Sequence, residues 1–273
     1  MAAGVRRDRD MVQIAGPDAR TYLQGQLSQD VETLKVGESA ETFVLQPNGK
    51  VAAWMRIIFV ADETYLLDVD VGWGTIVADR LNRFLLRTDC SVELMAWELV
   101  TVMDPVDMVE PESDGLVVPV SWPGLEALDL LGPAVSVPEG INEVPYSVWE
   151  QRRIAAGIPV MGAEIDDSTI PGATGVVDRS VSFTKGCYTG QELVARIASR
   201  SAGTPTRIVR ATGHGPTPPA DAECTFNGET AGRITSSASL QAEDFVALVE
   251  LKRAVGVPVM VDVGGVSVSL LAD

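Results

Sequence analysis

Cys187 is the residue of this sequence best placed to do chemistry. It stands in the run Lys-Gly-Cys-Tyr-Thr-Gly-Gln-Glu at residues 185–192, framed by two glycines and followed by a predicted helix. The N–H groups at a helix N-terminus and the ammonium of Lys185 both place positive potential near the sulfur, which favours thiolate over thiol. We therefore expect Cys187 to have a lowered pKa and to react with alkylating reagents faster than Cys90 and Cys224, which lack this framing.

Simpler interpretations of the same segment stay open. Cys187 could pack as a small apolar side chain beside Tyr188, and Gln191 and Glu192 could serve only as first-turn helix residues. A nucleophilic cysteine also needs a base. The single histidine, at position 214, lies in a predicted loop, so a hydrolase or transferase mechanism would depend on Lys185 or Glu192 instead.

Composition narrows the class of protein. The 273 residues are 46% hydrophobic and 22% charged, which indicates a folded chain of about two domains. Acidic side chains outnumber basic ones by 38 to 21, for a net charge of -17, and this field repels nucleic acid. We therefore expect no nonspecific nucleic-acid binding.

The cysteines and the N-terminal sequence indicate the compartment. Three widely spaced cysteines with no Cys-x-x-Cys pair suggest neither a disulfide framework nor a structural zinc site, and no residue is assigned to a metal. The N-terminus has no apolar stretch after its arginines, and no window approaches 18 apolar residues. We expect a soluble cytoplasmic protein that does not bind a membrane.

Helices and strands that could position these residues are predicted from hydrophobic spacing, and together they indicate an α+β protein. Helices are predicted at 17–31, 74–87, 148–156 and 190–199. Strands are predicted at 42–45, 51–60, 64–69, 99–103, 116–120 and 127–131, the first two joined by an Asn-Gly turn at 47–50. Shorter strands at 230–235, 245–251, 257–263 and 266–271 fit a C-terminal barrel or sandwich. The stripe of Arg80, Arg83 and Arg87 is interpreted either as a solvated helix face or as a binding surface.

The octapeptide at 185–192 resembles the signature of the YgfZ-type folate-binding proteins, and further similar segments follow in the family's order. These segments are 16–19, 22–30, 47–51, 80–84 and 232–237. The family is similar to the T-protein of the glycine cleavage system. The resemblance implies an aminomethyltransferase-like ring of three subdomains around a tetrahydrofolate pocket. Residues 1–205 would form a folate-binding core of two interleaved α+β subdomains, and residues 206–273 a C-terminal β-barrel domain.

The resemblance also implies a function. The family is implicated in assembly or repair of iron–sulfur cluster proteins and, through them, in tRNA modification. The implied cofactor is tetrahydrofolate or a derivative, and the implied partners are iron–sulfur proteins or their assembly factors, without direct nucleic-acid contact. True aminomethyltransferases carry an acidic pair after the Asn-Gly turn, near where this chain has Ala52-Ala53-Trp54. We therefore expect folate binding without aminomethyl transfer.

Seven residues are carried forward as candidates for the site. Cys187 and Lys185 are the candidate catalytic groups. The candidates for folate contacts are Tyr188 and Trp54 for stacking on the pterin, Gln191 and Glu192 at its edge, and Arg196 for the glutamate tail. Three alternatives remain: a tetrahydrofolate-dependent aminomethyltransferase-like enzyme, a thiol transferase that depends on Cys187, and a scaffold whose one thiolate supplies part of a Cys₄ cluster set.

Overall fold

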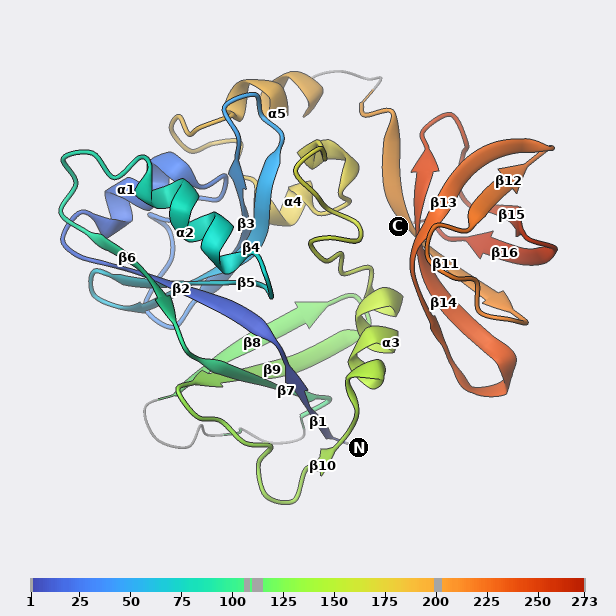
Figure 1. Cartoon of the computed structure of the whole chain (residues 1–273), viewed down its shortest axis with the longest axis horizontal. Coiled ribbons are helices and arrows are strands. Elements are labelled where there is room, and N and C mark those ends of the chain that lie inside the picture. The colour runs from blue at the N-terminus through green and yellow to red at the C-terminus, as the bar shows by residue number, and fades with distance from the viewer. Residues whose placement is uncertain (1, 106–108, 110–114, 199–202, 273) are drawn as a thin grey trace.

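Two five-stranded sheets and a closed barrel make up the chain (Figure 1). The computed structural model describes residues 2–105, 109, 115–198 and 203–272. The first sheet has the order β10 (Asn142–Glu143), β1 (Ala3–Arg7), β7 (Glu98–Met103), β9 (Leu125–Gly132) and β8 (Leu116–Trp122). The second has the order β3 (Ser39–Leu45), β4 (Val51–Ala61), β5 (Thr64–Asp70), β2 (Arg9–Ala15) and β6 (Ser91–Met95).

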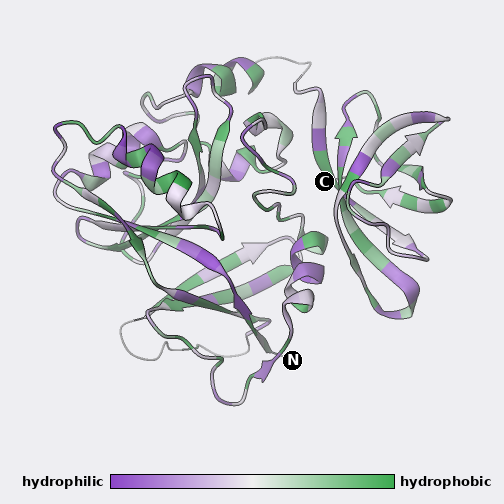
Figure 2. Ribbon diagram, viewed as in Figure 1, coloured by the Kyte–Doolittle hydropathy of each residue, from purple (hydrophilic) through white to green (hydrophobic). Residues whose placement is uncertain are grey.

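The N-terminal strands link the two sheets. β1 pairs with β7 in the first sheet and β2 pairs with β5 in the second, and only Asp8 separates them. Neither strand was predicted, because the charged residues at 6–10 interrupt the apolar pattern; Figure 2 shows the resulting hydrophilic stretch through β1 and β2. This junction brings charged side chains to the place where the sheets meet.

The predicted hairpin around the Asn-Gly turn is confirmed. β3 and β4 pair in antiparallel fashion, and Gln46 donates its N–H to the carbonyl of Lys50 across the turn. Gly49 has a φ of 82°, a left-handed conformation that glycine adopts without strain. The strands predicted at 64–69, 99–103, 116–120 and 127–131 correspond to β5, β7, β8 and β9.

The four predicted helices are present, and the first two are shorter than expected. They are α1 (Ala19–Gln26), α2 (Gly74–Asn82), α3 (Tyr146–Ala156) and α5 (Gln191–Ala198). The short helix α4 (Val177–Ser180) and the 3₁₀ helices at Pro171–Ala173 and Gln241–Glu243 were not predicted. α1 ends early because Leu27 is extended and the N–H of Ser28 donates to the carbonyl of Phe43 at 3.0 Å. Gly157 ends α3 with a φ of 81°, as its sequence position predicts.

The C-terminal strands close into a barrel, which confirms the barrel rather than the sandwich. Its order is β11 (Thr206–His214), β14 (Asp244–Lys252), β13 (Glu229–Ser239), β12 (Glu223–Phe226), β15 (Val259–Val263) and β16 (Val266–Leu270). α3 lies between the first sheet and this barrel (Figure 1). The prediction of a loop at His214 was wrong: the residue is the last of β11, and its exposed ring lies 3.0 Å from Asp244 Oδ1. Among the described residues, no helix is long and apolar enough to cross a membrane.

Candidate functional site

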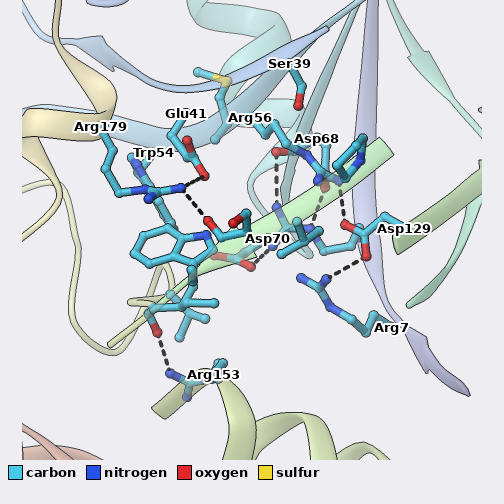
Figure 3. Close-up of a pocket in the computed structure, with 18 of the residues that line it drawn as sticks. Arg7, Ser39, Glu41, Trp54, Arg56, Asp68, Asp70, Asp129, Arg153 and Arg179 are labelled. Atoms are coloured by element: carbon cyan, nitrogen blue, oxygen red, sulfur yellow. Dashed lines mark hydrogen bonds and ion pairs between the residues drawn. The ribbon is translucent and has the colours of Figure 1, made fainter. Parts of the chain in front are cut away.

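A cavity of about 450 Å³, called here the central cavity, is lined by both five-stranded sheets together with α3 and α4 (Figure 3). Its apolar side consists of Trp54, Trp122 and Trp149, each at least nine-tenths buried. The rings of Trp54 and Trp122 meet edge to face with centroids 6.2 Å apart. Trp54 is also fixed by its indole N–H, which donates to Ser180 Oγ at 2.9 Å. These contacts give the cavity rigid, flat walls.

Charged side chains form the opposite side of the central cavity. Asp68 accepts from Arg9 Nε at 2.6 Å and from Arg56 Nη2 at 2.7 Å, and Arg56 Nη2 also donates to Asp129 at 2.6 Å. Arg9 pairs with Asp70 as well, and Arg7 lies 3.4 Å from Asp129. We call these three arginines and three aspartates the ion-pair network. Their formal charges cancel, so the network presents hydrogen-bonding groups to the cavity without adding net charge.

The network keeps the Asp68 carboxylate ionised. Burial by itself raises the pKa of a carboxyl group, but the adjacent Arg9 and Arg56 guanidinium groups hold the pKa of Asp68 below its ordinary value. The same pairing raises the pKa of Arg56 despite its burial. Asp68 is therefore a fixed anion rather than a group that exchanges protons near neutral pH.

Sequence reasoning missed this network although a signal was present. Arg56, Asp68 and Asp129 each interrupt a strand of apolar residues, where a charge is expected only with a partner. Arg7 and Arg9 were also missed, because the strands that carry them, β1 and β2, were not predicted. Which arginine meets which aspartate depends on how the strands pair, and this is not visible in any single segment.

The signature octapeptide lines a second cavity, of about 560 Å³. Its lining includes the candidates Cys187, Tyr188, Gln191 and Glu192 from the octapeptide, together with Arg196 from α5. The Cys187 thiol is exposed, whereas Tyr188 is buried and burial raises its pKa to about 12. We call this the cysteine cavity.

Two glycines bring the octapeptide against the turn between β3 and β4, as Figure 1 shows for α5 and that hairpin. A Cβ on Gly190 would lie 2.7 Å from the carbonyl oxygen of Gln46, and a Cβ on Gly49 would lie 2.4 Å from Leu193 Cβ. Both glycines also have positive φ. Close packing of backbone against backbone therefore holds Cys187 beside the turn.

Lys185 lines neither cavity. Its Nζ donates to the carbonyls of Gln24, Leu27 and Gln29 at 2.7, 2.8 and 2.8 Å, which uses all three ammonium protons. Burial lowers the pKa of Lys185 to about 8. The residue anchors the segment after α1, and the catalytic role predicted for it would require these bonds to break.

The structure divides the predicted site residues between two cavities. Trp54 lines the central cavity, while Tyr188 lines the cysteine cavity, so the two rings do not flank one space. Arg196 lies on the exposed side of α5 with the cysteine cavity. Among the described residues, no three His, Cys, Asp or Glu side chains converge as metal ligands would.

Comparisons with known proteins find relatives of this chain that include tRNA-modifying proteins and iron–sulfur cluster assembly factors. No family model matches it. It is 31% identical to an uncharacterized protein of Haemophilus influenzae, over 70% of this chain and 67% of the other. It is 25% identical to the tRNA-modifying protein YgfZ of Edwardsiella ictaluri, over 70% of this chain and 65% of that protein. It is 24% identical to a mitochondrial iron–sulfur cluster assembly factor IBA57 homolog of Neurospora crassa, but spans only 49% of its length.

A solved structure identifies the fold. The crystal structure of glycine cleavage system aminomethyltransferase T from Bartonella henselae matches 99% of this chain and 85% of its own, with a TM-score of 0.83 and 16% identity. The predicted aminomethyltransferase-like fold with a C-terminal barrel is confirmed.

Proposed function

The chain belongs to the YgfZ-type family, which is related to the glycine cleavage T-protein, and from this premise we propose that it binds a reduced folate in the central cavity. We further propose that it supports the assembly or repair of iron–sulfur proteins in the cytoplasm and, through them, tRNA modification. The relatives named as a tRNA-modifying protein and as an iron–sulfur cluster assembly factor support these roles.

The composition of the central cavity carries the proposal. Its volume of about 450 Å³ lies in the range of small-molecule sites. Three tryptophans supply aromatic surface for a pterin and its linker, and the guanidinium groups of Arg7 and Arg179 lie over the rings of Trp149 and Trp122. A folate would thus be held by Trp54, Trp122 and Trp149 against the ion-pair network, and it would supply one-carbon chemistry when bound.

The same cavity argues against aminomethyl transfer. A transferase needs a carboxylate that can exchange a proton or stabilise developing charge. At the segment after the Asn-Gly turn, Ala52 and Ala53 are buried and offer neither. Asp68 and Asp129 bond to arginines, and Asp70 accepts from Arg9 and from the N–H of Met161 at 2.8 Å.

Cys187 is proposed as the group that serves iron–sulfur partners. Its thiol is exposed, whereas Cys224 is buried with a pKa raised to about 11 and Cys90 is half-buried with a raised pKa. One thiolate supplies part of a cluster's ligand set, so the remaining ligands would come from a partner protein. The β3–β4 hairpin contributes to both cavities, through Trp54 and through Asn48. This hairpin is a physical route by which folate binding could affect the thiol.

We expect the purified chain to bind 5-formyltetrahydrofolate but to form no methylenetetrahydrofolate from an aminomethyl-lipoyl donor. Binding would be measured by calorimetric titration and transfer by product formation, with an authentic aminomethyltransferase as the positive control. Absence of binding would contradict the proposed folate site. Transfer at the rate of the control enzyme would contradict the proposed lack of aminomethyl transfer.

A further inference from the structure

Arg179 differs from the other arginines of the central cavity. The side chains of Arg7, Arg9 and Arg56 are each 11% exposed, and that of Arg153 is 4% exposed. Each of the four is bonded to carboxylates that lie in or beside the cavity. The Arg179 side chain, by contrast, is 38% exposed.

Arg179 also retains unused donors. Its Nη2 donates to Glu41 Oε1 at 3.2 Å and to the carbonyl of Ser121 at 2.9 Å. Among the described residues, Nε and Nη1 donate to no protein acceptor, which leaves three of the five guanidinium N–H groups for another molecule. Such donors suit a carboxylate, which a guanidinium binds through two parallel hydrogen bonds.

Surrounding contacts hold Arg179 in place at the cavity. Its guanidinium lies over the ring of Trp122, 4.0 Å from the centroid. Gln29 Nε2 donates to the Arg179 carbonyl at 2.9 Å, which fixes the backbone of α4. A guanidinium placed over an aromatic ring can still donate from its N–H groups to an anion.

Glu41 lies beside the same guanidinium (Figure 3). Its carboxylate is 20% exposed and takes one donor of Arg179. A bound anion would share the arginine with this negative charge and be repelled by it. Glu41 therefore reduces the attraction of Arg179 for anions in general.

We propose that Arg179 binds a carboxylate of the ligand in the central cavity and that Glu41 sets the strength of this contact by competing for the same guanidinium. This inference rests on the proposed folate site. It assigns the tail contact to Arg179, whereas the sequence suggested Arg196, which lines the cysteine cavity. The two arginines are thus separable by experiment.

The test compares 5-formyltetrahydrofolate with its diamide, in which both glutamate carboxylates are uncharged. For Arg179→Gln, we expect affinity for the folate to fall at least about tenfold, as loss of a charge-assisted contact predicts, while affinity for the diamide is unchanged. For Glu41→Gln, we expect affinity for the folate to rise and affinity for the diamide to stay the same. Calorimetry measures the affinities, and thermal unfolding checks that each variant folds.

Arg152→Gln is the matched control, since Arg152 is 36% exposed and pairs with Asp104, and neither residue lines the central cavity. Equal losses for both ligands in Arg179→Gln, or no loss, would overturn the assignment while leaving the folate site in place. A loss confined to Arg196→Gln would move the tail contact to the cysteine cavity. A parent chain that binds neither ligand would overturn the folate site and this inference together.

Discussion

Replacing Asp68 with alanine is expected to lower the free energy of unfolding by about 3–5 kcal/mol, the usual cost of removing one partner from a buried ion pair. Asp68 is 2% exposed and accepts from both Arg9 and Arg56. Without it, Arg56 keeps only Asp129 as a carboxylate partner, and two buried guanidinium groups lose a shared anion. Urea denaturation of the parent chain and the variant measures the difference.

Asp62→Ala is the matched control, because Asp62 is exposed at the turn between β4 and β5 and forms no ion pair with any residue that the structure describes. We expect this control to unfold like the parent chain. The pKa of Asp68 lies below its ordinary value, so its contribution is present above its unfolded pKa and is lost as pH falls through the folded pKa. We therefore also expect the free energy of unfolding to fall less at acid pH in Asp68→Asn than in the parent chain. If Asp68→Ala and Asp62→Ala were equally stable, the claim that the ion-pair network stabilises the fold would be contradicted.

Cys187→Ser is expected to reduce the activity of iron–sulfur-dependent enzymes in cells to the level seen without the protein. The thiol is exposed, and serine changes little volume, so thermal unfolding and folate affinity should match the parent chain. Serine lacks the soft thiolate that binds iron or attacks another sulfur. The measurement is the activity of cluster-dependent enzymes in cells that carry either variant in place of the parent gene.

Cys90→Ser is the control for this loss, because it makes the same chemical change at a half-buried cysteine outside both cavities. Full cellular activity with Cys187→Ser would show that the thiol is dispensable. An equal loss with Cys90→Ser would attribute the defect to cysteine content rather than to the cysteine cavity.

Much of the fold follows from local sequence. The Asn-Gly turn at 47–50 and the glycine after α3 each specify a backbone conformation by themselves, so their elements were predicted correctly. Among the barrel strands, β14 carries a continuous apolar run and β16 alternates apolar and polar residues, and both patterns are visible without knowledge of the partner strands. The early end of α1 was not predictable, because it depends on Ser28 pairing with Phe43 in a separate strand.

The central cavity was less predictable than the cysteine cavity. Most residues that line the cysteine cavity come from the contiguous segment 187–196, so one stretch of sequence pointed to that site. The central cavity draws Arg7, Trp54, Asp129 and Arg179 from widely separated segments, and their meeting depends on the order of strands in two sheets. Of its lining residues, only Trp54 was proposed from sequence, on the strength of a family resemblance. Charges inside apolar strands were the local signal of this site.

The proposed location of the folate is tested most directly by a crystal structure of the chain with 5-formyltetrahydrofolate at saturating concentration. The account predicts the pterin in the central cavity, against Trp54, Trp122 and Trp149 and bonded to the ion-pair network, with a tail carboxylate on Arg179. A pterin in the cysteine cavity beside Tyr188, or a central cavity filled only by water at that concentration, would contradict it.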